Sequence, residues 1–344
     1  MELSEKRNRS VDLLKGILAI FIITLHFDFQ SDSVVLKLFP FSLGMAVPMF
    51  LFLSGYLEAI SFNNKKIETF SDAYSIKLLY AKLKRIIFPY AIFFVAEQIL
   101  FRVWKIYSVG IFKYGILALM FDFLIGGIGQ GSYYFPIIVQ FIFLFPVIYF
   151  CIKKYGLKGL YGLFALNFFY EVLKQAYGMP HSEYRLLIFR YLFVISAGCF
   201  FALESVSEGN PAYAIKKKRL VMSVGFLLGF IFICLFCFTQ YQPKIVTFWS
   251  TTSVLCCLYV VPIMALYMKK AKIVFAPLEL IGKASWHIFL FQMLFYQYYY
   301  STQSLLTENT GLRYRVCVLI CVCGGVLFYL FEKGIYRVKI IIKH

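Results

Sequence analysis

Long apolar stretches separated by short polar connections recur along the whole chain of 344 residues. Each stretch is close to the roughly 20 residues that a helix needs to cross the hydrocarbon core of a bilayer. The pattern predicts an all-α, polytopic membrane protein with about ten transmembrane helices. It leaves no room for a separate soluble domain, so residues 1–344 are expected to form a single integral-membrane domain. The predicted spans are 13–30, 41–60, 86–106, 133–152, 157–176, 186–204, 219–239, 248–268, 279–300 and 312–332.

Two segments depart from this pattern. Segment 112–127 is short and contains Asp122, so we interpret it as an outer-side or re-entrant segment. Segment 74–87 has apolar residues on one helical face and Lys77 and Lys84 off it, which is typical of a helix that lies in the membrane interface. Lipid headgroups are the expected partner of this second segment.

The composition agrees with a membrane protein. Hydrophobic residues make up 61% of the chain and charged residues only 15%, compared with about 25% charged residues in ordinary soluble domains. The mean hydropathy is +0.76. The nine cysteines lie in or at the ends of apolar spans, and only Cys234 and Cys237 have CxxC spacing, so we expect packing residues rather than a metal site.

The formal net charge of +18 comes from basic residues concentrated in alternate connections. Clusters such as Lys65–Lys66, Lys153–Lys158 and Lys216–Arg219 alternate with connections that hold few basic residues. Because cytoplasmic connections of membrane proteins carry an excess of lysine and arginine, the alternation predicts that both termini are cytoplasmic. These residues therefore indicate topology and contact with membrane lipids, not binding of nucleic acid.

The first span carries two ionisable residues, Lys15 and His26, eleven positions apart. On a helix this spacing corresponds to about 16 Å, so Lys15 is expected near the cytoplasmic edge and His26 beyond the midplane. An ionisable side chain at such depth usually faces a protein interior or a water-filled cavity. The alternative is that Lys15 extends to the interface and His26 is a packing residue.

Four motifs, and a weaker fifth that starts at residue 132, carry a resemblance to a known family in their order and spacing. They read "DLLKGILAIFIITLH" from residue 12, "FLFLSGYL" from 50, "KLKRIIFPY" from 82, "SYYFPIIVQFIFLFP" from 132 and "LELIGKASWHIFLFQ" from 278. Together they resemble the acyltransferase 3 family of bacterial membrane acetyltransferases, in the branch similar to sugar O-acetylases. The family often has arginine where this chain has Lys15, and histidine where it has Gln292.

The resemblance implies an O-acyltransferase in the bacterial cytoplasmic membrane. The expected co-substrate is acetyl-coenzyme A, with no permanently bound cofactor, and the expected acceptor is a cell-envelope polysaccharide or its lipid-linked sugar precursor. A transporter or flippase for a glycan intermediate is the alternative, because deep polar residues also suit a substrate path. The absence of an obvious inverted repeat mildly disfavours several transporter architectures.

Transfer of an acetyl group to a hydroxyl needs a base, and His26 suits this role because imidazole titrates near neutral pH. Asp28 is the candidate partner of His26, although it falls on a different face of a regular helix. For the acyl donor, Lys15 and Arg85 offer positive charges to the phosphates of coenzyme A. The full set of expected site residues is His26 and Asp28 as catalytic, Lys15, Ser54, Arg85 and His287 as donor-binding, and Tyr134, Glu171 and Arg190 as acceptor-binding.

Several of these residues have an alternative, structural interpretation. Glu97, Arg102, Glu171 and Arg190 are expected in a polar layer in the outer half of the membrane that lines an acceptor pocket. Alternatively, Glu171 with Arg190, and Glu97 with Arg102, are buried ion pairs that hold helices together. Tyr134 is alternatively an interface anchor at the end of a span. His287 is alternatively a packing residue of the ninth span.

Overall fold

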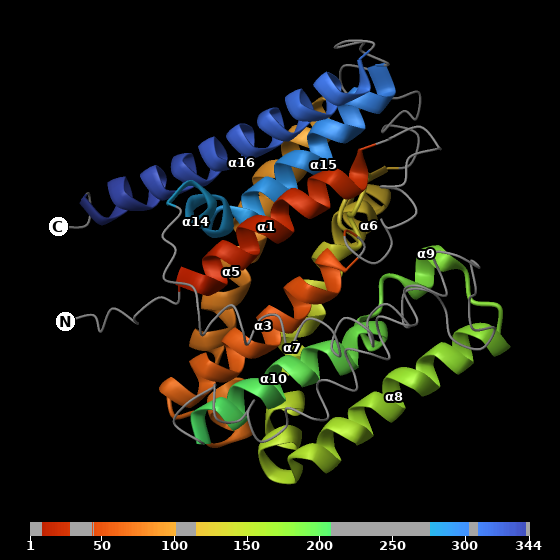
Figure 1. Cartoon of the computed structure of the whole chain (residues 1–344), viewed down its shortest axis with the longest axis vertical. Helices are drawn as coiled ribbons and strands as arrows, with labels where there is room; N and C mark the ends of the chain where they lie inside the picture. Colours follow the sequence, from red (N-terminus) through yellow and green to blue (C-terminus); the bar gives the residue numbers. More distant parts are fainter. Residues whose placement is uncertain are drawn as a thin grey trace. The chain divides into compact units, whose positions relative to one another are not determined.

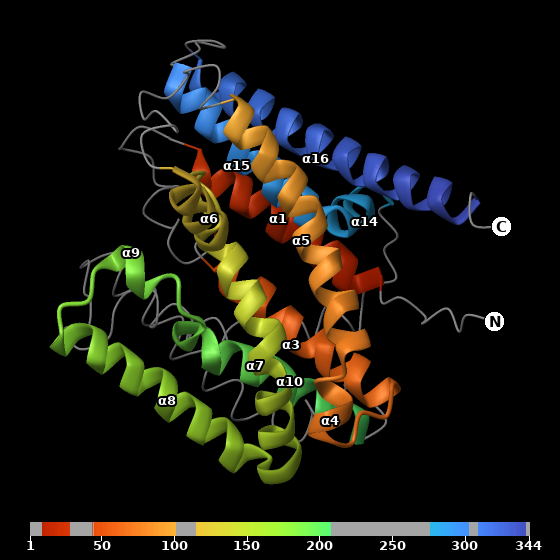
Figure 2. The same cartoon turned by 180° about the vertical axis from the view of Figure 1, so that it is seen from behind.

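The computed structural model describes residues 9–27, 43, 45–100, 115–207, 276–302 and 309–341. Over these ranges the backbone is helical almost throughout and contains no β-strand (Figure 1; the reverse side is shown in Figure 2). The all-α prediction is therefore confirmed for the described residues. The spans predicted at 219–239 and 248–268 lie outside them.

Contacts within the chain define two compact units. The first comprises residues 1–32, 81–136 and 274–344, and the second comprises residues 33–80 and 137–273. The first unit holds α1 (Arg9–His26), α5 (Ile76–Gln98) from residue 81, α6 (Gly115–Ile125), the start of α7 (Tyr134–Tyr155), α14 (Ala276–Lys283), α15 (Ser285–Thr302) and α16 (Thr310–Ile341). The second holds α3 (Ala46–Asn64), α4 (Phe70–Ala73), the rest of α7, α8 (Leu157–Ala176), α9 (His181–Tyr184), the 3₁₀ helix η3 (Ile188–Tyr191) and α10 (Leu192–Ser207).

Three helices within the described ranges are long and apolar enough to cross a membrane. They are Ala46–Asn64, Tyr134–Tyr155 and Thr310–Ile335, which correspond to the spans predicted at 41–60, 133–152 and 312–332. Helix α6 has only 11 residues, which is about 16 Å of helix and too short to cross the hydrocarbon core. The total of ten spans stays a prediction.

Two glycines set the approach of α1 and α14 in the first unit. A Cβ atom at position 16 would overlap the Leu278 carbonyl oxygen, and a Cβ atom at position 282 would overlap the Asp12 carbonyl oxygen. Small residues of this kind let helix backbones approach closely in a bilayer, where packing replaces the hydrophobic effect as the driving force. The contact fixes the position of α1, the helix that ends at His26.

The second unit uses the same device between α3 and α10. A Cβ atom at position 55 would overlap the Ile195 carbonyl oxygen, and one at position 198 would overlap the Phe52 carbonyl oxygen. Gly55 belongs to the "FLFLSGYL" motif, so the structure gives that motif a packing role. The hydroxyl of the neighbouring Ser54 donates a hydrogen bond to the Phe50 carbonyl at 2.8 Å, within α3 itself.

Candidate active site

Helix α1 ends at His26, and two tyrosines of α15 hold its last turn. The final carbonyl groups of a helix have no partner within that helix and must be satisfied from outside. Tyr296 donates its hydroxyl to the Ile23 carbonyl at 2.9 Å, and Tyr300 donates its hydroxyl to the His26 carbonyl at 2.7 Å. The Phe27 amide donates to the Thr24 carbonyl at 3.2 Å. The backbone of His26 is therefore fixed by α15.

The ring of His26 also has an orienting partner on α15. The amide nitrogen Nε2 of Gln292 lies 3.1 Å from His26 Nδ1, and Gln292 is completely buried. Its carbonyl oxygen Oε1 is also buried and has no hydrogen-bond partner among the described residues. The Tyr296 ring packs edge-on against the imidazole with centroids 6.3 Å apart. The hydrogen bond and the ring contact together hold the imidazole in one orientation.

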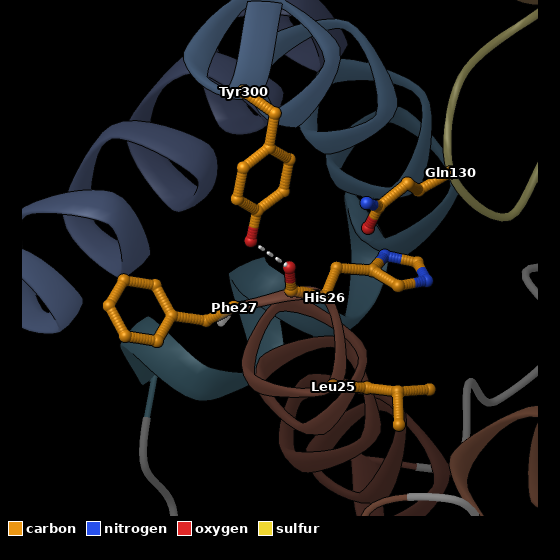
Figure 3. Close-up of a pocket in the computed structure, with 5 residues that line it drawn as sticks. All are labelled: Leu25, His26, Phe27, Gln130 and Tyr300. Atoms are coloured by element: carbon orange, nitrogen blue, oxygen red, sulfur yellow. Dashed lines mark hydrogen bonds between the residues drawn. The ribbon is translucent and has the colours of Figure 1, made fainter. Parts of the chain in front are cut away.

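An open pocket of about 400 Å³ lies at this end of α1. It is lined by Leu25, His26, Phe27, Gln130 and Tyr300. Figure 3 shows the imidazole of His26 and the side chain of Gln130 on the same side of the pocket, while Phe27 points the other way. His26 is partly buried and Gln130 is exposed. The pocket therefore gives a ligand access to the imidazole.

Two more of the expected site residues, Tyr134 and His287, are buried in the first unit. Tyr134 packs against Phe289 with ring centroids 5.1 Å apart. The Nε2 atom of His287 lies 2.5 Å from a carboxylate oxygen of Glu332, and its Nδ1 atom has no partner in the described part of the chain. His287 thus belongs to a buried pair that links α15 to α16.

The expected basic residues of the donor site are also in the first unit. Lys15 is partly buried on α1, and Arg85 is exposed on α5. Lys15 and His26 lie on one continuous helix, as the sequence predicts, and are separated by about 16 Å along its axis. Asp28, the expected partner of His26, lies outside the described residues.

The remaining expected site residues, Glu171 and Arg190, are buried in the second unit. The hydroxyl of Tyr184 donates to the Glu171 carboxylate. The guanidinium carbon of Arg190 lies 4.7 Å from the ring centroids of Tyr184 and Tyr191. This cluster joins α8 to the segment that leads into α10.

Sequence reasoning missed Gln130, Tyr300 and the contact of Gln292 with His26. A signal for the α15 residues is present in the sequence, because Gln292, Tyr296 and Tyr300 are spaced four apart. Side chains at this spacing lie on one face of a helix. A polar edge on an otherwise apolar span indicates contact with another polar element, and in the structure this element is the end of α1.

Comparison with known proteins identifies one family. A family model described as an acyltransferase domain matches residues 8–330, which is most of the chain and includes both His26 and Gln292. No curated protein and no solved structure matches the chain. Within the described ranges no group of three or more histidine, cysteine, aspartate or glutamate residues is placed to hold a metal ion.

Proposed function

The chain belongs to the acyltransferase 3 family of polytopic membrane proteins, and we propose that it moves an acetyl group from cytoplasmic acetyl-coenzyme A to an envelope sugar hydroxyl. The acceptor of this proposal is a cell-envelope polysaccharide or its lipid-linked precursor. The location is the bacterial cytoplasmic membrane, with both termini in the cytoplasm. Membership of the family makes the protein an acyltransferase, which favours an enzyme over a transporter or flippase.

The observation that carries the proposal is the position of His26 at an open pocket, with its ring held by Gln292. In the proposed reaction an imidazole nitrogen takes the proton from the acceptor hydroxyl as its oxygen attacks the thioester carbonyl. The carbon–sulfur bond then breaks, the acetyl group stays on the acceptor oxygen, and the proton passes from the imidazolium to the coenzyme A thiolate. His26 thus acts first as base and then as acid.

This role determines which way the Gln292 amide must face. If His26 uses Nε2 as the base, then Nδ1 carries a hydrogen and needs an acceptor. Rotating the Gln292 amide by half a turn exchanges Nε2 for Oε1 and supplies that acceptor. Oε1 has no hydrogen-bond partner among the described residues, so the rotation breaks no hydrogen bond of Oε1 within them. Gln292 is then the positioning residue that leaves Nε2 free for the substrate.

For the acyl donor, we propose that Lys15 and Arg85 bind the phosphates of coenzyme A. The exposed guanidinium of Arg85 offers paired donors, and Lys15 offers a point charge. Ser54 and His287 complete the proposed donor set, although Ser54 bonds within α3 and His287 bonds Glu332. Their contribution is therefore expected to be smaller than that of the two basic residues.

For the acceptor, we propose Tyr134, Glu171 and Arg190. Tyr134 is in the same unit as His26 and packs on Phe289. Glu171 and Arg190 are engaged with Tyr184 in the second unit. Of the three, only Tyr134 is in the same unit as His26.

The proposal is tested by incubating purified protein with labelled acetyl-coenzyme A and envelope glycan extracts. We expect label to appear on the glycan, and we expect His26→Gln to lower the rate by about 10² to 10⁴-fold, since glutamine cannot take a proton near neutral pH. The matched control is His181→Gln, at an exposed histidine of the second unit. Near-normal transfer by folded His26→Gln protein would remove His26 from the reaction, and absence of labelled glycan with every extract would overturn the proposed acceptor class.

A further inference from the structure

Glu97, near the end of α5, is a buried carboxylate that bonds to the backbone of a loop. It is completely buried. Its Oε1 atom accepts hydrogen bonds from the amides of Ile128 at 3.2 Å and Gly129 at 3.1 Å. Burial of a carboxylate is costly unless hydrogen bonds compensate for lost solvation. The loop amides provide part of this compensation, so Glu97 and the loop stabilise each other.

The loop bonded by Glu97 covers residues 126–132, between α6 and α7, and we name it the glycine loop. Gly127 and Gly131 have φ angles of +90° and +88°, which side chains rarely tolerate. A Cβ atom at position 127 would also overlap the Glu97 carboxylate. Glycine at positions 127 and 131 is therefore required by the shape of the loop, and at position 127 also by the close approach of Glu97.

The other end of the glycine loop lies against the imidazole of His26. A Cβ atom at position 131 would be 3.1 Å from His26 Cε1 and 3.6 Å from His26 Nε2. The preceding residue, Gln130, lines the His26 pocket (Figure 3). The loop thus forms the wall that faces the ring nitrogen not engaged by Gln292.

We propose that Glu97 is a positioning residue for acyl transfer, because it holds the glycine loop against His26 and presents Gln130 to the substrate. The inference rests on the proposed role of His26. Glu97 fixes the amides of residues 128 and 129, and these fix the path of the next two residues. Gly131 then limits the tilt of the imidazole, while the Gln130 amide offers hydrogen bonds to a substrate in the pocket.

The first test compares two replacements of Glu97. Glu97→Ala removes the acceptor of both loop amides and is expected to lower kcat about 10²-fold, because small displacements of reacting groups carry penalties of this size. Glu97→Gln keeps an oxygen for the same two amides and is expected to restore kcat to within about tenfold of the wild type. Equal activity of Glu97→Ala and wild type would overturn the proposal.

A second pair of variants covers the case in which Glu97→Ala fails to fold. Gly131→Ala introduces a methyl group beside His26, whereas Gly115→Ala introduces one at a glycine with a similar φ of +70° and no atom within 4 Å. Both carry a comparable backbone penalty, but only Gly131→Ala is expected to lower kcat. The same loss in both variants would show that strain alone is responsible and would overturn the positioning role.

A spectroscopic measurement separates positioning from general destabilisation. The chain has four histidines, so histidine-labelled protein gives a simple NMR spectrum in which His26 is assigned by its loss in His26→Gln. We expect Glu97→Ala, or Gly131→Ala if the former is unfolded, to shift the His26 ring signals and leave those of His287 in place. Unchanged His26 signals, or equal shifts in both histidines, would contradict the proposal.

Gln130 provides the readout on the substrate side. Gln130→Ala is expected to raise the KM of one substrate about tenfold, with a smaller change in kcat, because the residue lines the pocket, whereas Glu97 bonds the amides of residues 128 and 129. Unchanged KM values for both substrates would remove Gln130 from the proposal. Failure of the proposed function and failure of the loop inference give different results. If His26→Gln is active, the proposed role of His26 fails, although Glu97→Ala can still shift the His26 NMR signals. If His26→Gln is inactive but the Glu97 variants have wild-type activity, only the loop inference fails.

Discussion

Each unit holds a polar cluster, and the two clusters differ in whether an open pocket adjoins them. In the first unit, His26 has one ring nitrogen near Gln292 and an open pocket beside the ring. In the second unit, Glu171 accepts from Tyr184, and Arg190 lies over the rings of Tyr184 and Tyr191. The first arrangement leaves reactive atoms accessible to a ligand, whereas the second directs its charges toward side chains of its own unit.

Neighbouring polar residues of the second unit show the same inward use. Gln140 donates to the Leu186 carbonyl at 2.6 Å and accepts from the Ile188 amide at 3.1 Å. Asn167 accepts from the Phe193 amide at 3.2 Å. These side chains satisfy backbone groups in the irregular segment after α9 and in the first turn of α10, which would otherwise be unpaired at high cost in a low-dielectric surrounding. Burial alone therefore does not distinguish a functional polar residue from a structural one, and the open pocket beside His26 is the feature that separates the two clusters.

The largest effect is expected from Glu171→Ala. Loss of the carboxylate leaves the buried Tyr184 hydroxyl without this acceptor, and it removes a negative charge from the cluster that holds the buried Arg190. The free energy of unfolding should therefore fall by about 3 kcal/mol. Thermal unfolding in detergent measures the loss. The kcat per folded molecule is expected to stay near the wild-type value, and the proposed acceptor role of Glu171 adds only a raised acceptor KM. A raised acceptor KM with unchanged stability would show that Glu171 acts on the acceptor alone, and this would break the comparison.

The next effect concerns Gln292, on the reactive side of the comparison. Gln292→Met removes the hydrogen bond to His26 and is expected to lower kcat about 10 to 10²-fold, with little change in unfolding temperature. Gln292→Glu offers only acceptor oxygens to Nδ1–H and should retain more activity than Gln292→Met. Steady-state kinetics decide the order. Higher activity in Gln292→Met than in Gln292→Glu would mean that Nδ1 does not need an acceptor.

A smaller effect is expected from Tyr300→Phe. The change removes the hydroxyl that satisfies the His26 carbonyl at the end of α1, which costs about 1 kcal/mol. Activity should fall modestly because the last turn of α1 becomes less firmly held. The control is Tyr161→Phe, at an exposed tyrosine of α8, and equal effects of the two changes would argue against a specific role for Tyr300.

The smallest effect concerns the pH dependence of stability in the second unit. Desolvation by the surrounding protein, together with the positive charges of Arg190, Arg185 and Lys174, lowers the pKa of His181 below its usual value of 6.5. The folded protein therefore binds fewer protons than the unfolded chain below about pH 6.5, and acidification through this range reduces stability. His181→Gln should weaken the fall in unfolding temperature between about pH 7.5 and pH 5.5. An unchanged fall would show that other groups cause it.

The sequence by itself determined the helical class, the position of several membrane-length helices and the spacing of Lys15 and His26 on one helix. These features follow from local rules, because apolar length and helical periodicity act within a single segment. The order of the motifs also identified the family, which the match over residues 8–330 confirms. The number of spans and the assignment of site residues stay predictions.

Only the tertiary structure decided which polar groups meet. Gln292 contacts His26 across 266 positions of sequence, and Glu97 bonds the glycine loop about 30 positions away. From sequence, Glu97 was expected either in a polar acceptor layer or in an ion pair with Arg102, which lies outside the described residues. Periodicity shows which residues share one face of a helix, but not which faces pack together. That choice depends on the close approach of backbones at glycines such as Gly16 and Gly282, and this packing places α1 beside its neighbours and so positions the His26 site.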